Sequence, residues 1–141
     1  MNSMVLVEDS MRDAELIIEA LKEYNLLNVL VHVRDGQELM DYLHGEGSQA
    51  SRKSAEPELI LLDLKMPKMD GKEALRQIKS NPRFRRIPVV VMTSSREKAD
   101  VTEVYDLGAN AYVVKPLEFN DFVEAVRKLG GFWAHVNQPT S

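Results

Sequence analysis

Residues 59–71 have the sequence LILLDLKMPKMDG, and this stretch decides the fold class. Four apolar residues run directly into Asp63, and a proline and an Asp-Gly pair follow. An unbroken apolar run bounded by turn residues predicts a strand that is buried on both faces of a parallel sheet. Ligands of such sheets bind beyond the carboxyl ends of the strands, so Asp63 is predicted at a functional edge. The alternative is an acid that merely caps the next turn.

The composition indicates one soluble globular domain. The chain has 141 residues, of which 44% are hydrophobic and 28% charged. A net charge of -4 gives no electrostatic reason to expect a nucleic-acid partner, and the lack of cysteine excludes disulfides and Cys-based zinc sites. No apolar run approaches the roughly 18 residues that span a bilayer, and the start does not resemble a signal peptide. We therefore expect a cytoplasmic protein with no membrane partner.

Strands and helices alternate along the rest of the chain. Four further strands are predicted at apolar runs, in residues 4–7, 29–33, 88–92 and 111–114. Helices with one apolar stripe are predicted in residues 10–25, 36–43, 72–80, 97–107 and from 118 onward. This alternation predicts an α/β domain, a doubly wound (βα)5 flavodoxin-like three-layer sandwich with a parallel five-stranded sheet of order 2-1-3-4-5.

Two segments depart from this alternation. Residues 45–58 are rich in Gly, Ser, Ala, Glu and Lys, which predicts a long surface loop. Gly130-Gly131 is expected to fray or end the last helix before Phe132-Trp133, so a short C-terminal extension begins at about residue 130. We expect a single domain over residues 1–141 with no effector domain.

The residues that end the predicted strands form a chemical set: Glu8 with Asp9, Asp63, Thr93 and Lys115. Strands one and three are neighbours in this strand order, so three carboxylates meet at one edge. A shared divalent cation relieves their repulsion, and oxygen ligands suit Mg²⁺ or Mn²⁺. Taken singly, these residues have ordinary alternatives, namely an acid at a helix N-terminus, a helix cap and a surface lysine.

The chemistry that uses such a set is phosphoryl transfer to a carboxylate. Its transition state places charge on the phosphoryl oxygens, so catalysis consists mainly of positioning and neutralisation. Asp63 is the predicted nucleophile, with Mg²⁺ held by Glu8 and Asp9. Lys115 and Thr93 are predicted to take the remaining phosphoryl oxygens.

The sequence resembles the response-regulator receiver domain of two-component signalling over essentially its whole length. The motifs that carry the resemblance are VLVED at residues 5–9, LLDLKMPKMDG at 61–71, MTS at 92–94 and VKP at 114–116. The resemblance implies that Asp63 is the phosphoacceptor and that Glu8 and Asp9 bind Mg²⁺, for which Mn²⁺ or Ca²⁺ could substitute. It implies a sensor histidine kinase as partner and a downstream protein that is unknown.

The resemblance also implies roles for residues around the acceptor. The backbone carbonyl of Lys65 is expected on the metal, and Thr93 with Tyr112 is expected to switch protein contacts. The Lys115–Pro116 peptide bond is expected to be cis.

A narrower resemblance concerns the single-domain regulators served by bacterial phytochrome kinases. The loop at residues 45–58, its lead-in YLHGEG at 42–47 and the closing pair Phe132-Trp133 carry it. It implies a phytochrome kinase as partner and a homodimer. The aromatic pair Phe132 and Trp133 supplies the candidate dimer contacts, and the alternative is that the pair packs back on its own domain.

Three other functions would use parts of this residue set. A receiver-like adaptor would act without phosphorylation, but the complete residue set argues against it. A metal-dependent phosphohydrolase of the haloacid-dehalogenase type has Asp-x-Asp, where this chain has Lys65. A nucleotide-binding module would need a Gly-rich loop after the first strand. We expect a protein that catalyses only its own phosphorylation and dephosphorylation and is otherwise not an enzyme.

Overall fold

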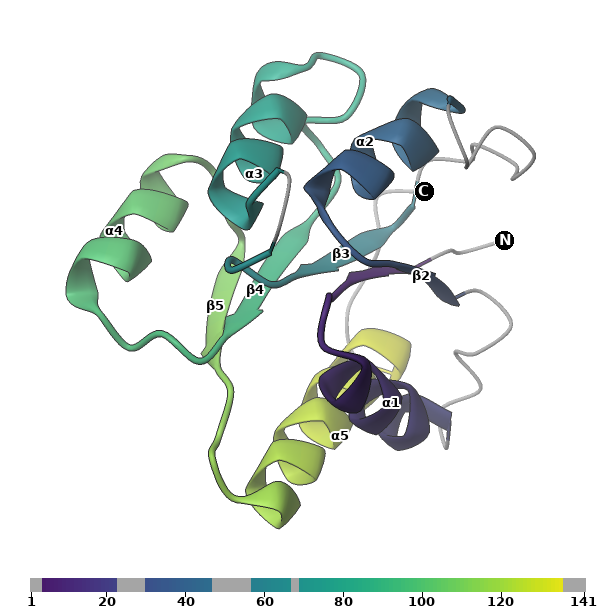
Figure 1. The fold of residues 1–141 in the computed structure, drawn as a ribbon, viewed down its shortest axis with the longest axis vertical. Helices are drawn as coiled ribbons and strands as arrows, with labels where there is room; N and C mark the ends of the chain where they lie inside the picture. Colours follow the sequence, from purple (N-terminus) through teal and green to yellow (C-terminus); the bar gives the residue numbers. More distant parts are fainter. Residues whose placement is uncertain (1–3, 23–29, 47–56, 67–68, 136–141) are drawn as a thin grey trace.

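The computed structural model describes residues 4–22, 30–46, 57–66 and 69–135. Within them, strands and helices alternate along the chain (Figure 1): β1 Met4–Val7, α1 Met11–Leu21, β2 Leu30–Val33, α2 Gly36–His44, β3 Leu59–Leu62, α3 Gly71–Ser80, β4 Val89–Thr93, α4 Lys98–Asp106, β5 Ala111–Val114 and α5 Phe119–His135. None of the helices in these residues is long and apolar enough to cross a membrane. Most of the loop predicted at residues 45–58 lies outside the described residues, as does the predicted end of the first helix at residue 25.

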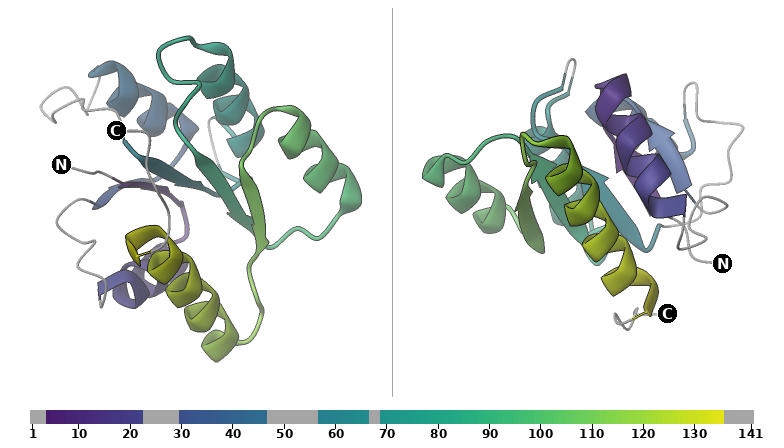
Figure 2. Two further views of the ribbon diagram at one scale, coloured as in Figure 1. Left: turned by 180° about the vertical axis from the view of Figure 1, so that it is seen from behind. Right: turned by 90° about the horizontal axis from the view of Figure 1, so that it is seen from below.

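The sheet is parallel and has the predicted order β2-β1-β3-β4-β5. It is covered on both faces: α1 and α5 pack side by side on one face, and α2, α3 and α4 lie on the other (Figures 1 and 2). This is the three-layer sandwich that the sequence predicts. The parallel order places every strand's carboxyl end at the same edge of the sheet.

The core has two parts because successive strand residues point to opposite faces. In β1, for example, Val5 and Val7 face α2 and α3, whereas Met4 and Leu6 face α1 and α5. Every residue of β1, β3 and β4 is buried. These are the strands whose sequences are continuous apolar runs, as expected for central strands.

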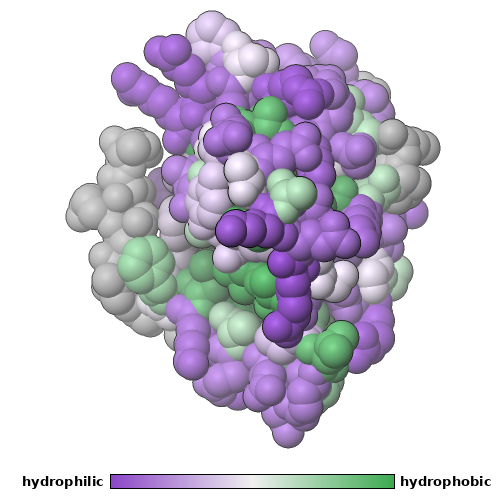
Figure 3. All heavy atoms as spheres, turned by 90° about the vertical axis from the view of Figure 1, so that its left-hand side faces the viewer, coloured by the Kyte–Doolittle hydropathy of each residue, from purple (hydrophilic) through white to green (hydrophobic). Residues whose placement is uncertain are grey.

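The strand β5 forms one edge of the sheet, and all four of its residues are half-buried. Figure 3 shows the side of the molecule to which α4, β5 and α5 contribute. Hydrophobic atoms gather there in a hollow between hydrophilic surfaces above and below. This side therefore offers an apolar surface, defined here as the α4–β5–α5 face.

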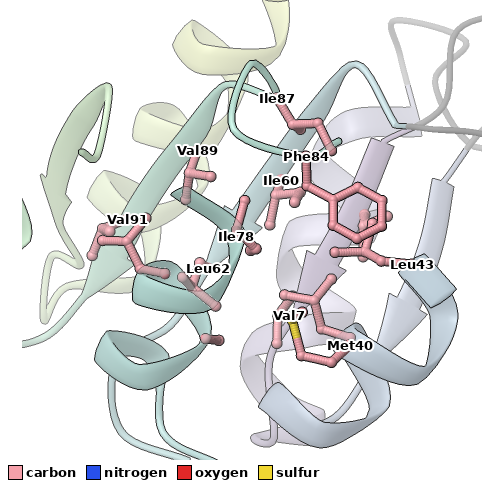
Figure 4. Close-up of a cluster of buried hydrophobic side chains, with 14 of the residues drawn as sticks. Val7, Met40, Leu43, Ile60, Leu62, Ile78, Phe84, Ile87, Val89 and Val91 are labelled. Atoms are coloured by element: carbon pink, nitrogen blue, oxygen red, sulfur yellow. The ribbon is translucent and has the colours of Figure 1, made fainter. Parts of the chain in front are cut away.

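Phe84 is a core residue that the sequence analysis did not identify. It lies in the turn between α3 and β4, beside the exposed Arg83 and Arg85, yet it is fully buried. Its ring lies beside Leu43 of α2 (Figure 4) and makes an edge-to-face contact with His44, with 5.2 Å between the ring centroids. Phe84 therefore anchors the α3–β4 turn to α2 through hydrophobic packing. The basic residues beside it in the sequence gave no indication of this role.

The prediction that Gly130-Gly131 ends the last helix is wrong. Helix α5 continues through both glycines to His135. Each glycine weakens a helix by about 0.5–1 kcal/mol relative to alanine. Trp133 packs against the same core cluster as Val126 and Leu129, and this burial offsets the two glycines.

Candidate functional site

The backbone holds three of the predicted site residues at one edge of the sheet. Each stands just beyond the end of its strand, and its N–H donates to a carbonyl oxygen of a neighbouring strand. The bonds are Glu8 to Val33 at 3.0 Å, Asp63 to Val7 at 3.1 Å and Lys115 to Thr93 at 2.7 Å. The sheet pairing therefore extends one residue further and fixes the Cα positions of all three.

Glu8, Asp9 and Asp63 form an acidic cluster. One carboxylate oxygen from each lies within 4.8 Å of the others. Glu8 is 1% exposed and Asp63 8% exposed, while Asp9 is open to solvent. Three like charges, two of them away from water, favour a divalent cation with a preference for oxygen ligands. The donor set therefore fits Mg²⁺ or Mn²⁺ and does not suit zinc, which prefers nitrogen and sulfur.

Lys115 joins this cluster to α1. Its Nζ donates to Glu8 Oε1 at 2.5 Å, to Asp13 Oδ2 at 3.0 Å and to Asp63 Oδ2 at 3.5 Å. Burial by itself lowers the pKa of Lys115, but the hydrogen bond to Glu8 and the charge of Asp63 outweigh it, so the pKa is raised. Lys115 therefore keeps a positive charge beside the Asp63 carboxylate.

Within the acidic cluster, Glu8 has a perturbed pKa. Burial, with the nearby Asp63 carboxylate, raises the pKa of Glu8 from 4.5 to about 7, although the Lys115 ammonium opposes the rise. An ionised Glu8 is therefore costly in the metal-free protein. A divalent cation would favour the ionised form.

Thr93 and Tyr112 meet at Ser95. The Ser95 N–H donates to Thr93 Oγ1 at 3.4 Å, and Tyr112 Oη donates to the Ser95 carbonyl oxygen at 2.9 Å. Thr93 is completely buried at the end of β4. One residue of the β4–α4 loop thus contacts both residues that were predicted to form the switch.

Ser95 also connects this loop to helices α3 and α4. Its Oγ donates to Asp100 Oδ2 at 2.5 Å, and Lys72 Nζ contacts Asp100 at 2.6 Å and Glu103 at 2.7 Å. Hydrogen bonds to Asp100 and Glu103 raise the pKa of Lys72, and the Lys72 and Ser95 hydrogen bonds lower that of Asp100. This network ties the position of α4 to the loop that carries Ser95.

The sequence analysis missed Asp13, Lys72 and Asp100. Asp13 lies in the first turn of the helix that follows Glu8 and Asp9, and this position was the one signal for it. The contact between Lys72 and Asp100 spans 28 residues and carries no motif. The predicted metal contact, the backbone of Lys65, follows Asp63 in the same loop, and the Lys65 side chain is exposed.

The predicted cis bond between Lys115 and Pro116 is wrong for this structure. The described residues contain no cis peptide bond. The trans isomer of an X-Pro bond is intrinsically favoured by about 0.5–1 kcal/mol. With the Lys115–Pro116 bond trans, Lys115 Nζ donates to the carboxylates of Glu8, Asp13 and Asp63.

Comparison with known proteins identifies the family. Residues 4–127 match the family described as "Response regulator receiver domain". The chain belongs to this family. As in the expectation from its motifs, the receiver domain covers most of the chain, and the acidic cluster lies within it.

The receiver domain is similar to regulators of cyanobacterial origin. "Response regulator Rcp1" of Synechocystis sp. is 42% identical over 130 residues, which cover 92% of this chain and 87% of Rcp1. The structure of the phosphorylated cyanobacterial phytochrome response regulator RcpA has a TM-score of 0.91 and 41% identity, and 99% of each chain is covered. The Mn²⁺-bound form of Rcp1 has a TM-score of 0.90 and 37% identity, with 100% of both chains covered.

These findings give the general function. The chain is a receiver domain of two-component phosphorelay signalling, and proteins of this kind work with histidine kinases. It is a signalling protein rather than a classical enzyme. Its cofactor is a divalent cation, Mg²⁺ or Mn²⁺, for which the cluster of Glu8, Asp9 and Asp63 supplies oxygen ligands.

Proposed function

We propose that Asp63 accepts the phosphoryl group of a sensor histidine kinase. The observation that carries this proposal is the contact of Lys115 with both Asp63 and Glu8 at the edge where the acidic cluster lies. A nucleophilic carboxylate, a cation site and a fixed positive charge are the groups that phosphoryl transfer requires. All three lie together at this edge of the sheet, where Asp63 is 8% exposed.

In the proposed reaction, an Asp63 carboxylate oxygen forms a bond to phosphorus while the bond from phosphorus to the kinase histidine nitrogen breaks. The electron pair of that bond leaves with the imidazole. A divalent cation held by Glu8, Asp9, Asp63 and the Lys65 backbone carbonyl would neutralise charge on the phosphoryl group. Lys115 binds a second phosphoryl oxygen through its ammonium, and the Thr93 hydroxyl donates to a third.

The switch follows from the bonds of Ser95. When the Thr93 hydroxyl turns toward the phosphoryl group, the bond that Thr93 Oγ1 accepts from Ser95 is lost. Ser95 then moves, and with it the carbonyl that holds Tyr112 and the hydroxyl that holds Asp100. The α4–β5–α5 face would change in response, which would alter its contacts with a downstream protein.

The proposal predicts a defined chemical product. Acetyl phosphate with Mg²⁺ should produce one adduct on the parent protein, detectable by intact mass, and none on Asp63→Asn. The control is Asp106→Asn, a change of the same kind at an exposed residue at the end of α4, which should be labelled like the parent. No adduct on the parent would exclude the proposal and leave the receiver-like adaptor as the better reading.

The proposal includes self-catalysed dephosphorylation. The adduct should decay in buffer with no other protein, more slowly once Mg²⁺ is chelated. If the protein instead hydrolyses added phosphate esters at a steady rate, the result would favour the phosphohydrolase.

The proposed kinase partner is a phytochrome. Support comes from RcpA, which is a phytochrome response regulator and resembles this chain over 99% of both lengths. Phosphotransfer from a panel of purified histidine kinases, phytochromes included, tests it. Faster transfer from a kinase without a phytochrome sensor would contradict this choice. A cytoplasmic location of the receiver domain remains part of the same proposal.

Homodimer contacts at Phe132 and Trp133 remain a proposal, and the two residues differ in what supports them. Phe132 is 49% exposed, so it is available to a partner. Trp133 is partly buried and packs on the core of its own chain. Sedimentation of the parent and of Phe132→Asp, with and without acetyl phosphate, tests the dimer. A monomer throughout would remove it.

A further inference from the structure

Asp13 is an acid of the site that does not belong to the acidic cluster. It lies in the first turn of α1 and is 17% exposed at its side chain. Among the described residues, the carboxylates within hydrogen-bond distance of Lys115 are those of Glu8, Asp13 and Asp63. Two of these belong to the cluster that fits a cation, and Asp13 does not.

The position of Asp13 in the helix does not by itself explain its orientation. An acid at the third helical position commonly accepts a hydrogen bond from the backbone N–H of the capping residue. Here the cap is Ser10, and its N–H donates to Glu8 Oε2 at 3.2 Å. Asp13 instead accepts from Lys115 at 3.0 Å, with Arg12, whose side chain is 71% exposed, at 3.5 Å on its other oxygen.

A lysine ammonium and a divalent cation compete for the same carboxylate oxygens. Lys115 contacts Glu8 and Asp63, and a cation held by those residues draws on the same electron pairs. A carboxylate outside the cluster can keep the ammonium nearby without contributing to this competition.

We propose that Asp13 is the positioning residue for Lys115: it holds the ammonium at the site while a divalent cation takes the oxygens of Glu8 and Asp63. The inference rests on the proposed function of this site. Without the Asp13 carboxylate, the only carboxylates among the described residues that Lys115 contacts are those of the cluster. The ammonium then competes more strongly with the cation.

The test is a double-mutant cycle on Mn²⁺ affinity. Mn²⁺ is the only ligand added, and electron paramagnetic resonance measures the concentration of the free ion. Asp13→Asn should weaken Mn²⁺ affinity by roughly three- to tenfold, the effect expected for the net contribution of one hydrogen bond. Asp13→Glu should restore most of the affinity. Glu15→Gln removes one charge from an exposed position of the same helix, and it should change the affinity by less than about twofold.

The same change in a Lys115→Met background separates positioning from direct attraction between Asp13 and the cation. If Asp13 acts through Lys115, Asp13→Asn should have little effect in that background. An equal effect in both backgrounds, or no effect in the parent, would overturn the inference.

A second measurement does not depend on the Lys115→Met protein folding. In the Mg²⁺-loaded parent and in Asp13→Glu, the Lys115 ammonium protons should exchange slowly with water in ¹⁵N NMR, and in Asp13→Asn they should exchange faster. Unchanged exchange would again overturn the role of Asp13. Failure of the proposed function is recognised separately, since it would appear as a parent protein that acetyl phosphate does not label.

Discussion

Replacing Glu8 with glutamine should stabilise the metal-free receiver domain near neutral pH, although it removes a proposed metal ligand. Glu8 is 1% exposed, and burial raises its pKa from 4.5 to about 7. Glutamine has nearly the shape of a protonated glutamate and carries no charge. The substitution therefore removes the penalty of holding an ionised carboxylate at this position.

The magnitude follows from the pKa. Moving a pKa from 4.5 to about 7 corresponds to roughly 3 kcal/mol, since one pKa unit is about 1.4 kcal/mol. Between these pH values the folded protein keeps a proton on Glu8 that the unfolded chain has released. The folded state binds more protons, so its stability falls as the pH rises. Below pH 4.5 Glu8 is protonated in both states, and above about pH 7 the full penalty is present.

Urea unfolding in the presence of a chelator, from about pH 4.5 to pH 8, measures this effect. The difference in unfolding free energy between Glu8→Gln and the parent cancels the contribution of other titrating groups. It should grow from near zero to roughly 3 kcal/mol in favour of the variant. Saturating Mg²⁺ should shrink or reverse it, because the metal binds and stabilises the parent.

The control for this experiment is Glu19→Gln, also on α1, whose side chain is 72% exposed. Its effect should be small and independent of pH over this range. A difference for Glu8→Gln that stays constant with pH, or a variant less stable than the parent at about pH 8, would refute the argument that an ionised Glu8 is costly.

Three further predictions concern positions fixed by packing. A Cβ at Gly71 would clash with the Asp63 carbonyl oxygen, so Gly71→Ala should slow labelling by acetyl phosphate about ten- to a hundredfold. Labelling at the parental rate would contradict this. Phe84→Ala should lower the unfolding free energy in urea by about 3–5 kcal/mol, against less than about 0.5 kcal/mol for Arg85→Ala; equal losses would argue against Phe84 as an anchor. Gly131→Ala should raise it by about 0.5–1 kcal/mol, and a loss would indicate that α5 requires glycine there.

The sequence predicted the strands, most of the helices and their order in the sheet because these depend on local patterns. Apolar runs such as residues 59–62 and the turn residues that bound them identify buried parallel strands without knowledge of any contact. Once the strands are parallel, their carboxyl ends share one edge. Glu8, Asp9 and Asp63 could therefore be predicted to meet, and the structure brings their oxygens within 4.8 Å.

Local patterns failed where packing outweighed them. Gly130-Gly131 indicated a helix end, but α5 continues because Trp133 packs on the core. Basic residues flank Phe84 in the sequence, a pattern typical of a solvated loop, but the Phe84 side chain is buried. In both cases burial of an aromatic ring, a tertiary interaction, decided the outcome.

The tertiary structure alone decided the electrostatics of the site. Lys115 contacts Glu8 and Asp13 across 107 and 102 residues of sequence, and no spacing rule predicts such contacts. The raised pKa of Glu8 depends on how much solvent the surrounding side chains exclude. The sequence by itself determined which chemical groups stand at the edge of the sheet. Distance and burial, which exist only in the folded chain, decided how these groups share their charges.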